Sequence, residues 1–490
     1  MSPSSNRLSP TGNRHHGVSL ARSVAYRILR RVESAGALAV DLLQGGEVAA
    51  LRDVDRALVT ELVMGVLRWQ GDLDFEIERL SGKALRTLDP EVVVILRLGL
   101  YQICFLEKIP VSAAVNESVE LVKQARKRSA AGFVNAVLRK AEPVVPRPAP
   151  RPGPDPESRT RASSPAASAS LLDRACRATP ARLLERWSIH FGPEAARALA
   201  LASVSVPPTV LRVTGGLASL DGIERELAAE GIAVRRARYA PHALLVESGR
   251  VQASRAWQQG RVVIQDEASQ LVAILLRVEP GQRVLDLAAA PGIKSAQLAA
   301  ALGRGEGGVP GSRVGGSVLV ACDVSARRLA DLNCLLPRQV PPDVRCSVVR
   351  LDATQSLPFR RCFDRVLLDA PCSGTGTLAR NPEIKWRLRP DDIARLAENQ
   401  AQMLRQALEV LKPHGRLVYA TCSLEGEENE RVVECVLKEV QGVRALGREP
   451  LRREAPEIAD LIDADGYFRT RPDLHRTDGF FAAVLETSDK

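Results

Sequence analysis

Apolar positions repeat with a helical period from residue 18 to about residue 140. Val24, Ile28 and Val32 recur at spacings of three or four, as residues on one face of a helix do. The stretch from Val92 to Phe105 is apolar on nearly all sides, which is typical of the central helix of a bundle. Residues 18–142 are therefore predicted to form an all-α domain.

The pattern changes twice beyond this region. Residues 143–170 carry many prolines among Arg, Ser and Ala, which favours an extended linker without a packed core. Residues 171–260 begin with helical spacing and continue as alternating strands and a helix, which predicts a small α+β subdomain. Residues 1–17 are polar and are predicted to be a disordered tail.

From residue 261 to residue 490, short apolar runs alternate with helical stretches, as in an α/β domain with a parallel sheet. The predicted strands end in acids, namely Asp286, Asp323, Asp352 and Asp369. Ligands of such a sheet bind beyond the carboxyl ends of its strands, so four acids in order predict a Rossmann-like domain with its site at that edge. The Gly-rich residues 303–317 are predicted to be a surface loop.

Two cysteines follow predicted strands at the same edge. Cys372 comes three residues after Asp369, and Cys422 follows the apolar run Leu417–Ala420. Two cysteines at strand ends beside an aspartate suggest covalent chemistry on an electrophilic ring, such as that of cytosine. A thiolate that adds to C6 of a cytosine makes C5 nucleophilic, and after methylation of C5 a base removes the C5 proton and the thiol leaves. A nearby carboxyl group would stabilise the charge that moves onto the ring. The spacing alone leaves open which cysteine is the nucleophile.

A nucleotide-type cofactor is indicated by the turn Leu287–Lys294, where small residues join a strand to a helix. Asp323 is suited to ribose hydroxyls, and Asp352 to an adenine amino group or to the amine of the cofactor. The turn contains no GxGxxG and the chain no GxxxxGK[ST], which disfavours dinucleotides and ATP. S-adenosylmethionine fits this pattern better.

Charge and cysteine content narrow the class of protein. A net charge of +10 and a pI near 9.3 favour a polyanionic partner. The basic cluster Lys123–Arg128 is read equally well as a phosphate contact or as a helix-end charge. Nine cysteines without close pairs argue against disulfides and a metal site. Without a long apolar stretch or signal core, a cytoplasmic protein with no membrane contact is expected.

Three motifs resemble those of the Sun group of RNA cytosine-C5 methyltransferases: Asp369–Gly376, Asn381–Trp386 and Ala420–Glu430. Helical segments of the N-terminal region are similar to the NusB-like domain of bacterial members that methylate 16S rRNA; these segments are Val24–Leu29, Asp55–Arg68, Leu96–Gln102 and Ser112–Val122. The resemblance implies a NusB-like bundle, a small α+β RNA-binding subdomain and a class I methyltransferase domain.

The resemblance also implies the cofactor, the substrate and the site residues. S-adenosylmethionine would be the cofactor, and 16S rRNA of the small-subunit precursor the substrate, with no DNA partner and a monomeric enzyme. Cys422 would be the nucleophile, Cys372 would assist product release, and Asp369 would face the base. The residues expected to bind the cofactor are Ala288, Ala289, Ala290, Pro291, Gly292, Ile293, Lys294, Asp323, Asp352 and Asp369.

Two departures from the group fall in the cofactor turn. Where the group usually has Cys-Ala-Ala-Pro-Gly-Gly-Lys, this chain has Ala288 for the cysteine and Ile293 for the second glycine. A β-branched residue at positive φ would be strained by about 1 kcal/mol or more. Ile293 supports one alternative, a non-catalytic RNA-binding factor of ribosome assembly. A second alternative keeps the enzyme class and changes the substrate: a tRNA cytosine-C5 methyltransferase.

Overall fold

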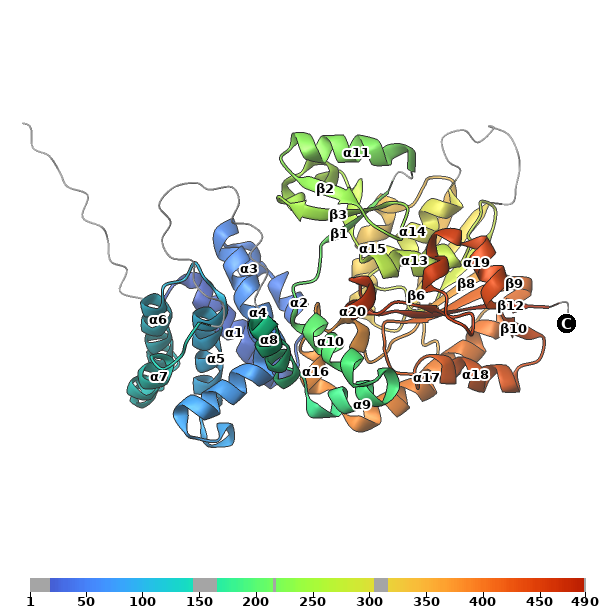
Figure 1. Cartoon of the computed structure of the whole chain (residues 1–490). Coiled ribbons are helices and arrows are strands. Elements are labelled where there is room, and N and C mark those ends of the chain that lie inside the picture. The colour runs from blue at the N-terminus through green and yellow to red at the C-terminus, as the bar shows by residue number, and fades with distance from the viewer. Residues whose placement is uncertain (1–17, 144–164, 215–216, 304–315, 489–490) are drawn as a thin grey trace, which may run out of the picture. The chain divides into compact units, whose positions relative to one another are not determined.

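The computed structural model describes residues 18–143, 165–214, 217–303 and 316–488 (Figure 1). It divides into two compact units, Met1–Leu184 and Glu185–Lys490. The predicted tail lies outside the described residues, as do most of the predicted linker and most of the Gly-rich insertion. None of the described helices combines the length and apolar character that crossing a membrane requires.

The first unit is helical, as predicted. Its longer helices are α1 (Leu20–Ala35), α4 (Asp53–Ser81), α5 (Pro90–Phe105), α6 (Val111–Gln124), α7 (Ala131–Leu138) and α8 (Pro165–Arg177), with the short α2 (Ala39–Leu43) and α3 (Gly46–Ala49) between α1 and α4. Helix α5 is the central one: every residue from Val92 to Cys104 is buried, and α5 contacts α1, α4, α6 and α7. Gly65 of α4 lies so close to the ring of Tyr101 that a Cβ there would overlap it. The apolar pattern therefore identified the centre of the bundle.

Helix α8 begins at Pro165, before the predicted end of the linker at residue 170. Its Arg174 and Arg177 pair with the carboxylate of Asp72 in α4, at 2.6 and 2.8 Å. Asp72 is fully buried, and burial raises its pKa while the two arginines act in the opposite direction. A buried carboxylate needs such partners, so these ion pairs explain why α8 belongs to the helical unit.

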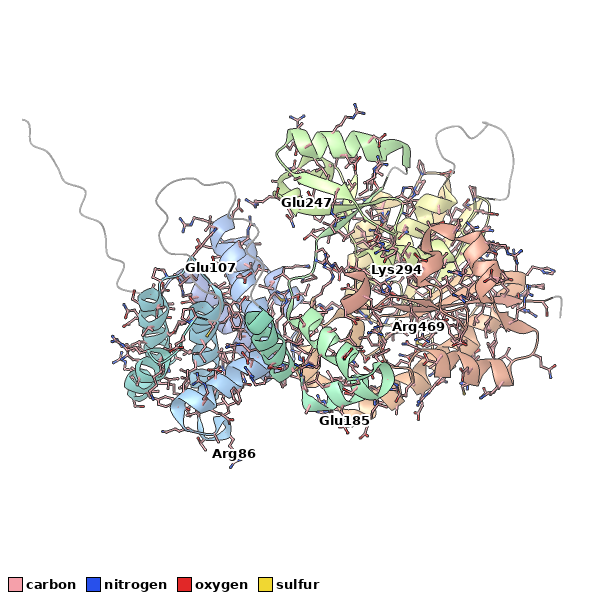
Figure 2. All side chains as sticks on the ribbon, in the orientation of Figure 1. Arg86, Glu107, Glu185, Glu247, Lys294 and Arg469 are labelled. Atoms are coloured by element: carbon pink, nitrogen blue, oxygen red, sulfur yellow. The ribbon has the colours of Figure 1, made fainter. Side chains whose placement is uncertain are left out.

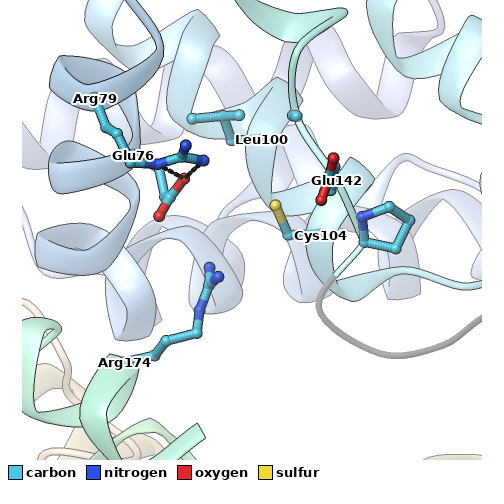
Figure 3. Close-up of a pocket in the computed structure, with 8 residues that line it drawn as sticks. Glu76, Arg79, Leu100, Cys104, Glu142 and Arg174 are labelled. Atoms are coloured by element: carbon cyan, nitrogen blue, oxygen red, sulfur yellow. Dashed lines mark hydrogen bonds and ion pairs between the residues drawn. The ribbon is translucent and has the colours of Figure 1, made fainter. Parts of the chain in front are cut away.

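A cavity of about 270 Å³ lies within this unit (Figure 3). Its lining residues are Glu76, Arg79, Leu100, Cys104, Ala141, Glu142, Pro143 and Arg174. Arg79 donates a hydrogen bond to Glu76 at 2.6 Å, and Arg174 pairs with Asp72. Burial raises the pKa of the Cys104 thiol to about 11, so this thiol is protonated at neutral pH. The cavity is thus lined by paired charges and an unreactive thiol.

The second unit begins at Glu185, within α9 (Ala181–Phe191). It continues with α10 (Pro193–Val204) and a small antiparallel sheet. The sheet has the order β2-β3-β1-β4, formed by β1 (Val210–Val213), β2 (Ala233–Arg236), β3 (Ala243–Ser248) and β4 (Val262–Ile264). Helix α11 (Leu217–Ala229) contacts β1 and β2. Apolar residues of the strands and of α11, among them Leu211, Leu227 and Leu244, form one core. This is the α+β subdomain that the sequence predicted.

The main sheet has the order β10-β12-β9-β8-β5-β6-β7. Its strands are β5 (Arg283–Asp286), β6 (Ser317–Asp323), β7 (Val344–Arg350), β8 (Phe363–Asp369), β9 (Leu411–Thr421), β10 (Val443–Ala445) and β12 (Phe481–Thr487). Strands β5 to β9 pair in parallel, whereas β12 pairs antiparallel with β9 and with β10. Helices α13 (Glu267–Leu275) and α14 (Ile293–Leu302) pack in one core, and α17 (Pro390–Glu409) and α18 (Glu430–Glu439) in the other (Figure 1).

The strand order reverses at β5, because β6 and β7 extend to one side of it and β8 and β9 to the other. Such a switch point opens a crevice at the carboxyl ends of the central strands. Asp286 ends β5, Asp323 ends β6 and Asp369 ends β8, whereas Asp352 follows the end of β7. The predicted Rossmann-like fold is confirmed, and three of its acids end strands at this edge.

Candidate active site

The two predicted reactive cysteines meet at this edge. Cys372 and Cys422 are 50 residues apart in the sequence, yet their Sγ atoms are 3.3 Å apart. The pairing of β8 with β9 explains this, since Asp369 stands beside Ala420 in the parallel register and both loops leave the sheet at the same edge. The N–H of Gly376 donates to the carbonyl of Cys422 at 2.9 Å, which ties the two loops together.

Lys294 and Asp369 form an ion pair at the site. Lys294 lies in the first turn of α14 (Figure 2), and its Nζ is 2.7 Å from Oδ2 of Asp369. The same Nζ lies 5.3 Å from the centre of the Phe480 ring. Burial opposes the positive charge, but Asp369 and, to a smaller extent, Cys422 raise the pKa of Lys294 above its ordinary value. The site thus holds an ammonium group close to both a carboxylate and the Cys422 sulfur.

The two cysteines differ in their surroundings. The hydrogen bond to Cys422, together with burial, raises the pKa of Cys372 well above its ordinary value, and the negative charges of Cys422 and Glu428 act in the same direction. Cys372 is therefore held as a thiol. The ammonium group of Lys294 interacts electrostatically with Cys422, whose negative charge raises the pKa of Lys294. The two cysteines therefore differ in the charges that act on them, Glu428 acting on Cys372 and Lys294 on Cys422.

The cofactor turn carries its positive φ at Gly292, with φ of 107°, and not at Ile293. Ile293 is the first residue of α14, and it is absent from the positive-φ residues of the described chain. A Cβ at position 292 would come within 2.8 Å of Leu332, so this position requires glycine. The condition for strain at Ile293 is not met, because the chain keeps a glycine at the one position where the turn needs it.

Asp286 has the features of a ligand-binding acid. It is 1% exposed; its Oδ2 accepts from the Ser295 hydroxyl at 2.7 Å, while Oδ1 has no hydrogen-bond partner. Burial raises its pKa to about 7. A buried carboxylate oxygen without a partner is costly, so a donor from a bound ligand would satisfy it. Together with the turn at Gly292, this carboxylate fits the polar groups of S-adenosylmethionine.

The other two predicted cofactor acids differ in exposure. Asp323 is 3% exposed, and its Oδ1 accepts from the N–H of Ser325 at 2.8 Å. Asp352 is exposed, and its Oδ1 accepts from both the N–H and the hydroxyl of Thr354. Both acids therefore also cap the turn that follows their strand, which is the ordinary structural role of such a residue.

Two residues that the sequence analysis did not single out organise the site. Glu428 is fully buried and accepts hydrogen bonds from Ser373 and Ser423, each of which follows one of the cysteines. Arg380 pairs with Asp266 and Asp478 at 3.0 and 2.9 Å, which fastens the loop after Cys372. The one signal in the sequence for Glu428 was the serine that follows each cysteine.

A cluster of possible metal ligands occurs in the described residues at His190, Glu425 and Glu427. Arg186 already pairs with the two carboxylates, at 2.7 Å to Glu425 and 3.0 Å to Glu427, and His190 is exposed. The guanidinium group supplies the positive charge that these carboxylates require. The cluster is therefore explained as an ion-pair network.

A cavity of about 860 Å³ reaches the loop after Cys372. It is bounded by α10, by the α+β subdomain, by the loop from Thr375 to Arg380 and by residues 472–478. Its lining includes Arg235, Arg238 and Arg476, and also the strongly exposed apolar side chains of Val206 and Leu474. Cationic and apolar groups thus share a hollow that is large enough for part of a polymeric substrate.

Comparisons with known proteins agree with this architecture. The family profile described as 16S rRNA methyltransferase RsmB/F matches residues 273–486, the NusB family matches residues 19–143, and a ferredoxin-like domain of RsmF/B-like methyltransferases matches residues 179–252. These matches correspond to the three parts of the chain that the sequence distinguished.

Individual relatives match over most of the chain. The "Probable ribosomal RNA small subunit methyltransferase B" of Bacillus subtilis is 33% identical over 89% of this chain and 91% of its own length. The ribosomal RNA small subunit methyltransferase B of Pseudomonas putida is 33% identical over 80% of this chain and 83% of its own. A methyltransferase homologue from Pyrococcus horikoshii aligns with a TM-score of 0.52 and 30% identity, over 65% of this chain and 99% of that one. The chain therefore belongs to the RsmB/F family of S-adenosylmethionine-dependent methyltransferases.

Proposed function

We propose that this protein methylates C5 of a specific cytosine in 16S rRNA through a covalent adduct between Cys422 and C6 of the base. The observation that carries the proposal is the meeting of two cysteine sulfurs 3.3 Å apart next to the Lys294–Asp369 ion pair. A methyl transfer to a carbon atom requires a nucleophilic carbon, and this arrangement supplies the groups that would create one.

The cofactor would be held at the carboxyl ends of β5, β6 and β7. Its expected contacts are the turn Ala288–Lys294 together with Asp323, Asp352 and Asp369, and the unpartnered oxygen of Asp286 adds one acceptor. When bound, S-adenosylmethionine supplies an electrophilic methyl group.

Cys422 would act as the nucleophile. Its thiolate adds to C6, the C5–C6 double bond opens, and C5 gains the electron density needed for methylation. Asp369, at the end of β8, would face N3 and the 4-amino group and accept a hydrogen bond from that amino group, while the ammonium group of Lys294 beside it would offset the negative charge that moves onto the ring. Lys294 holds that carboxylate at 2.7 Å and lies close to the Cys422 sulfur, so one ammonium group serves both residues.

Cys372 would assist the last stage. A base removes the C5 proton, the electrons reform the C5–C6 double bond, and the bond between C6 and the Cys422 sulfur breaks. Cys372 carries a thiol proton and lies 3.3 Å from the departing sulfur, so it is placed to give that sulfur a hydrogen bond as the thiolate leaves. This division of roles follows the different surroundings of the two cysteines.

An RNA substrate is supported by charge and by the relatives. The net charge is +10, and arginines line the cavity that reaches the loop after Cys372. Two relatives of similar length are named ribosomal RNA small subunit methyltransferase B. The target base must leave its stack to reach the cysteines, so the enzyme would act on unpaired or flipped RNA of the small-subunit precursor. We propose that it does so as a monomer.

Trapping the adduct tests the proposal. RNA with 5-fluorocytosine at the target lacks the C5 proton, so elimination is blocked and the protein stays attached. We expect a denaturation-resistant adduct with the wild type and with Cys435→Ala, an exposed cysteine of α18, but none with Cys422→Ala. An adduct that survives Cys422→Ala and disappears with Cys372→Ala would reverse the assigned roles.

Two further measurements separate the alternatives. Bisulfite sequencing of 16S rRNA and of tRNA, from cells with and without the gene, identifies the substrate; a cytosine that loses its methyl group only in tRNA contradicts the rRNA assignment. Calorimetry with S-adenosylmethionine tests the non-catalytic alternative, for which no binding is expected.

A further inference from the structure

Glu428 lies beneath both cysteine loops. It is fully buried, just before α18 begins at Glu430. Its Oε1 accepts hydrogen bonds from the N–H of Ser373 at 2.8 Å and from Nε2 of Gln400 at 3.0 Å. Its Oε2 accepts from the Ser423 hydroxyl at 2.6 Å and also from the Ser373 hydroxyl. One carboxylate therefore receives four hydrogen bonds from three segments of the chain.

Two of its partners are the residues that directly follow the cysteines. Ser373 follows Cys372, Ser423 follows Cys422, and their hydroxyl oxygens are 3.0 Å apart. The cysteine loops leave different strands, β8 and β9, and the carboxylate joins them one residue beyond each sulfur. The backbone positions next to both sulfurs thus share this anchor, which joins the two loops in addition to the hydrogen bond from the N–H of Gly376 to the carbonyl of Cys422.

The anchor is itself fixed by buried groups. Gln400 of α17, which is fully buried, donates from Nε2 to Glu428 and to the carbonyl of Pro371, at 3.0 and 2.9 Å. The Tyr419 hydroxyl of β9 donates to the backbone carbonyl of Glu428. Burial raises the pKa of Tyr419 well above its ordinary value, so its hydroxyl is a donor throughout the neutral range.

The charge of Glu428 reaches Cys372. The pKa of that thiol is raised first by its hydrogen bond to Cys422 and by burial, and then by the negative charges of Cys422 and Glu428. The ionisable groups around the pair are thus Cys422, Glu428 and Tyr419, with Lys294 on the Cys422 side. A carboxylate in this position favours a thiol at Cys372.

We propose that Glu428 is a positioning residue, which holds Cys372 and Cys422 at reacting distance by binding the serine that follows each of them. Because Glu428 is fully buried, it acts through the two loops. Its importance for catalysis rests on the roles given to the cysteines in the proposed function, whereas its effect on the geometry of the pair does not.

Disulfide formation measures that geometry directly and needs neither RNA nor cofactor. Diazenedicarboxamide accepts two electrons and two protons from two thiols, which become a disulfide while its N=N bond becomes N–N. The rate for the Cys372–Cys422 pair is read from peptide masses, because the chain has nine cysteines. Glu428→Gln keeps the shape but replaces one acceptor oxygen by NH₂, and we expect the rate to fall about tenfold.

Glu425→Gln is the matched control. Glu425 is fully buried in the same loop, but its carboxylate accepts from Arg186 and Trp187 and from neither serine hydroxyl. We expect a disulfide rate within about twofold of the wild type, since the cysteine geometry is kept. Equal losses in both variants would show that any buried charge in this loop has the same effect, and would overturn the proposal.

A second readout follows the charge. Alkylation of Cys372 by iodoacetamide, measured against pH by peptide mass, should reach half its maximum at a lower pH in Glu428→Gln, because one negative charge is removed. Should Glu428→Gln fail to fold, Ser373→Ala and Ser423→Ala each remove one hydroxyl contact, and both should slow disulfide formation. Unchanged disulfide rates in the serine variants, or in a folded Glu428→Gln whose alkylation profile is also unchanged, would overturn the assignment.

Discussion

The Sγ atoms of Cys372 and Cys422 lie 3.3 Å apart at the ends of two adjacent parallel strands. At this distance the two thiols share a hydrogen bond, so the proton affinity of one depends on the state of the other. Cys372 carries the raised pKa, and Lys294 stands near Cys422. The two cysteines therefore stand in different electrostatic surroundings, with Glu428 acting on Cys372 and Lys294 acting on Cys422.

Lys294 should be required for catalysis. Lys294→Met removes the ammonium group that lies 2.7 Å from Asp369 and close to the Cys422 sulfur. The carboxylate of Asp369 is then left without its counter-ion, and Cys422 loses the positive charge that interacts with it. We expect single-turnover methyl transfer from labelled S-adenosylmethionine to RNA to fall by about 100-fold or more.

Lys412→Met is the control for that variant. Lys412 pairs with Asp364 at the same distance of 2.7 Å, and this pair joins β9 to β8 at the ends opposite to those that carry the cysteines. Its loss should leave the single-turnover rate within about twofold of the wild type. Similar losses for the two lysines would mean that the ion pairs serve the sheet and not the reaction.

Asp286 should make the stability of the fold depend on pH. Burial raises its pKa from 3.8 to about 7, so the folded protein binds this proton more tightly than the unfolded chain does. The resulting stabilisation is complete below the unfolded pKa and is lost as the pH rises through about 7. Asp286→Asn cannot ionise, and its free energy of unfolding should therefore rise relative to that of the wild type between about pH 4 and pH 7.

Denaturant unfolding of the full chain at a series of pH values measures this difference. Asp331→Asn, at an exposed position of α15 (Ala326–Gln339), is the control and should differ from the wild type by the same small amount at every pH. A difference between Asp286→Asn and the wild type that does not change with pH would contradict the role given to burial.

Gly376 should tolerate no side chain. A Cβ at this position would collide with the carbonyl oxygen of Gly479 and would come within 2.8 Å of that of Cys422. Both obstacles are backbone atoms, so the Cys372 loop would have to move away from Cys422. We expect Gly376→Ala to cost about 1–3 kcal/mol of stability and to abolish the 5-fluorocytosine adduct.

Gly222→Ala makes the same chemical change where nothing lies within 4 Å of the new methyl group. This glycine lies within α11, so alanine should stabilise the chain by roughly 0.5–1 kcal/mol and leave adduct formation unchanged. Thermal unfolding and the adduct assay, run on both variants, test the pair. An active Gly376→Ala would show that the two loops do not need their close approach.

The fold could be predicted where the signal is local. The helix around Val92–Cys104 is apolar on nearly all sides, and four of the five parallel strands of the main sheet are short apolar runs near an acid, so both appear in the pattern itself. The start of α8 at Pro165 was not predicted, because its first residues resemble the proline-rich stretch before them. Arg174 and Arg177 in the C-terminal half of α8 pair with Asp72, which lies about a hundred positions earlier in the chain. A contact between residues so far apart leaves no signal in the local sequence pattern.

The site could be predicted only in part, for a related reason. The cysteines and Asp369 follow predicted strands, and parallel neighbours bring their carboxyl ends to one edge. Glu428 stands in a run of acids with Glu425, Glu427 and Glu430, and nothing in that run indicates which carboxylate binds the serines that follow the cysteines. The partners of Lys294 and Arg380 lie 75 and 98 or more positions away, and they became visible only in the structure.

The cavity beside the Cys372 loop should bind the RNA chain around the target base. Arg238 and Arg476 line it, Arg238 lying over the ring of Tyr239 and Arg476 exposed. Phosphate contacts by such residues add affinity without touching the reacting atoms, so Arg238→Ala with Arg476→Ala should raise KM for RNA several-fold and leave kcat unchanged. The slope of log affinity against log salt should become shallower by about 0.7 for each phosphate that the variant no longer neutralises.

Arg395→Ala is the control for this double variant. Arg395 is an exposed arginine of α17 that pairs with Asp392, and its loss should change neither KM for RNA nor the salt slope. A fall in kcat with an unchanged salt slope would mean that the two arginines stabilise the structure of the site, and that the RNA binds to another surface.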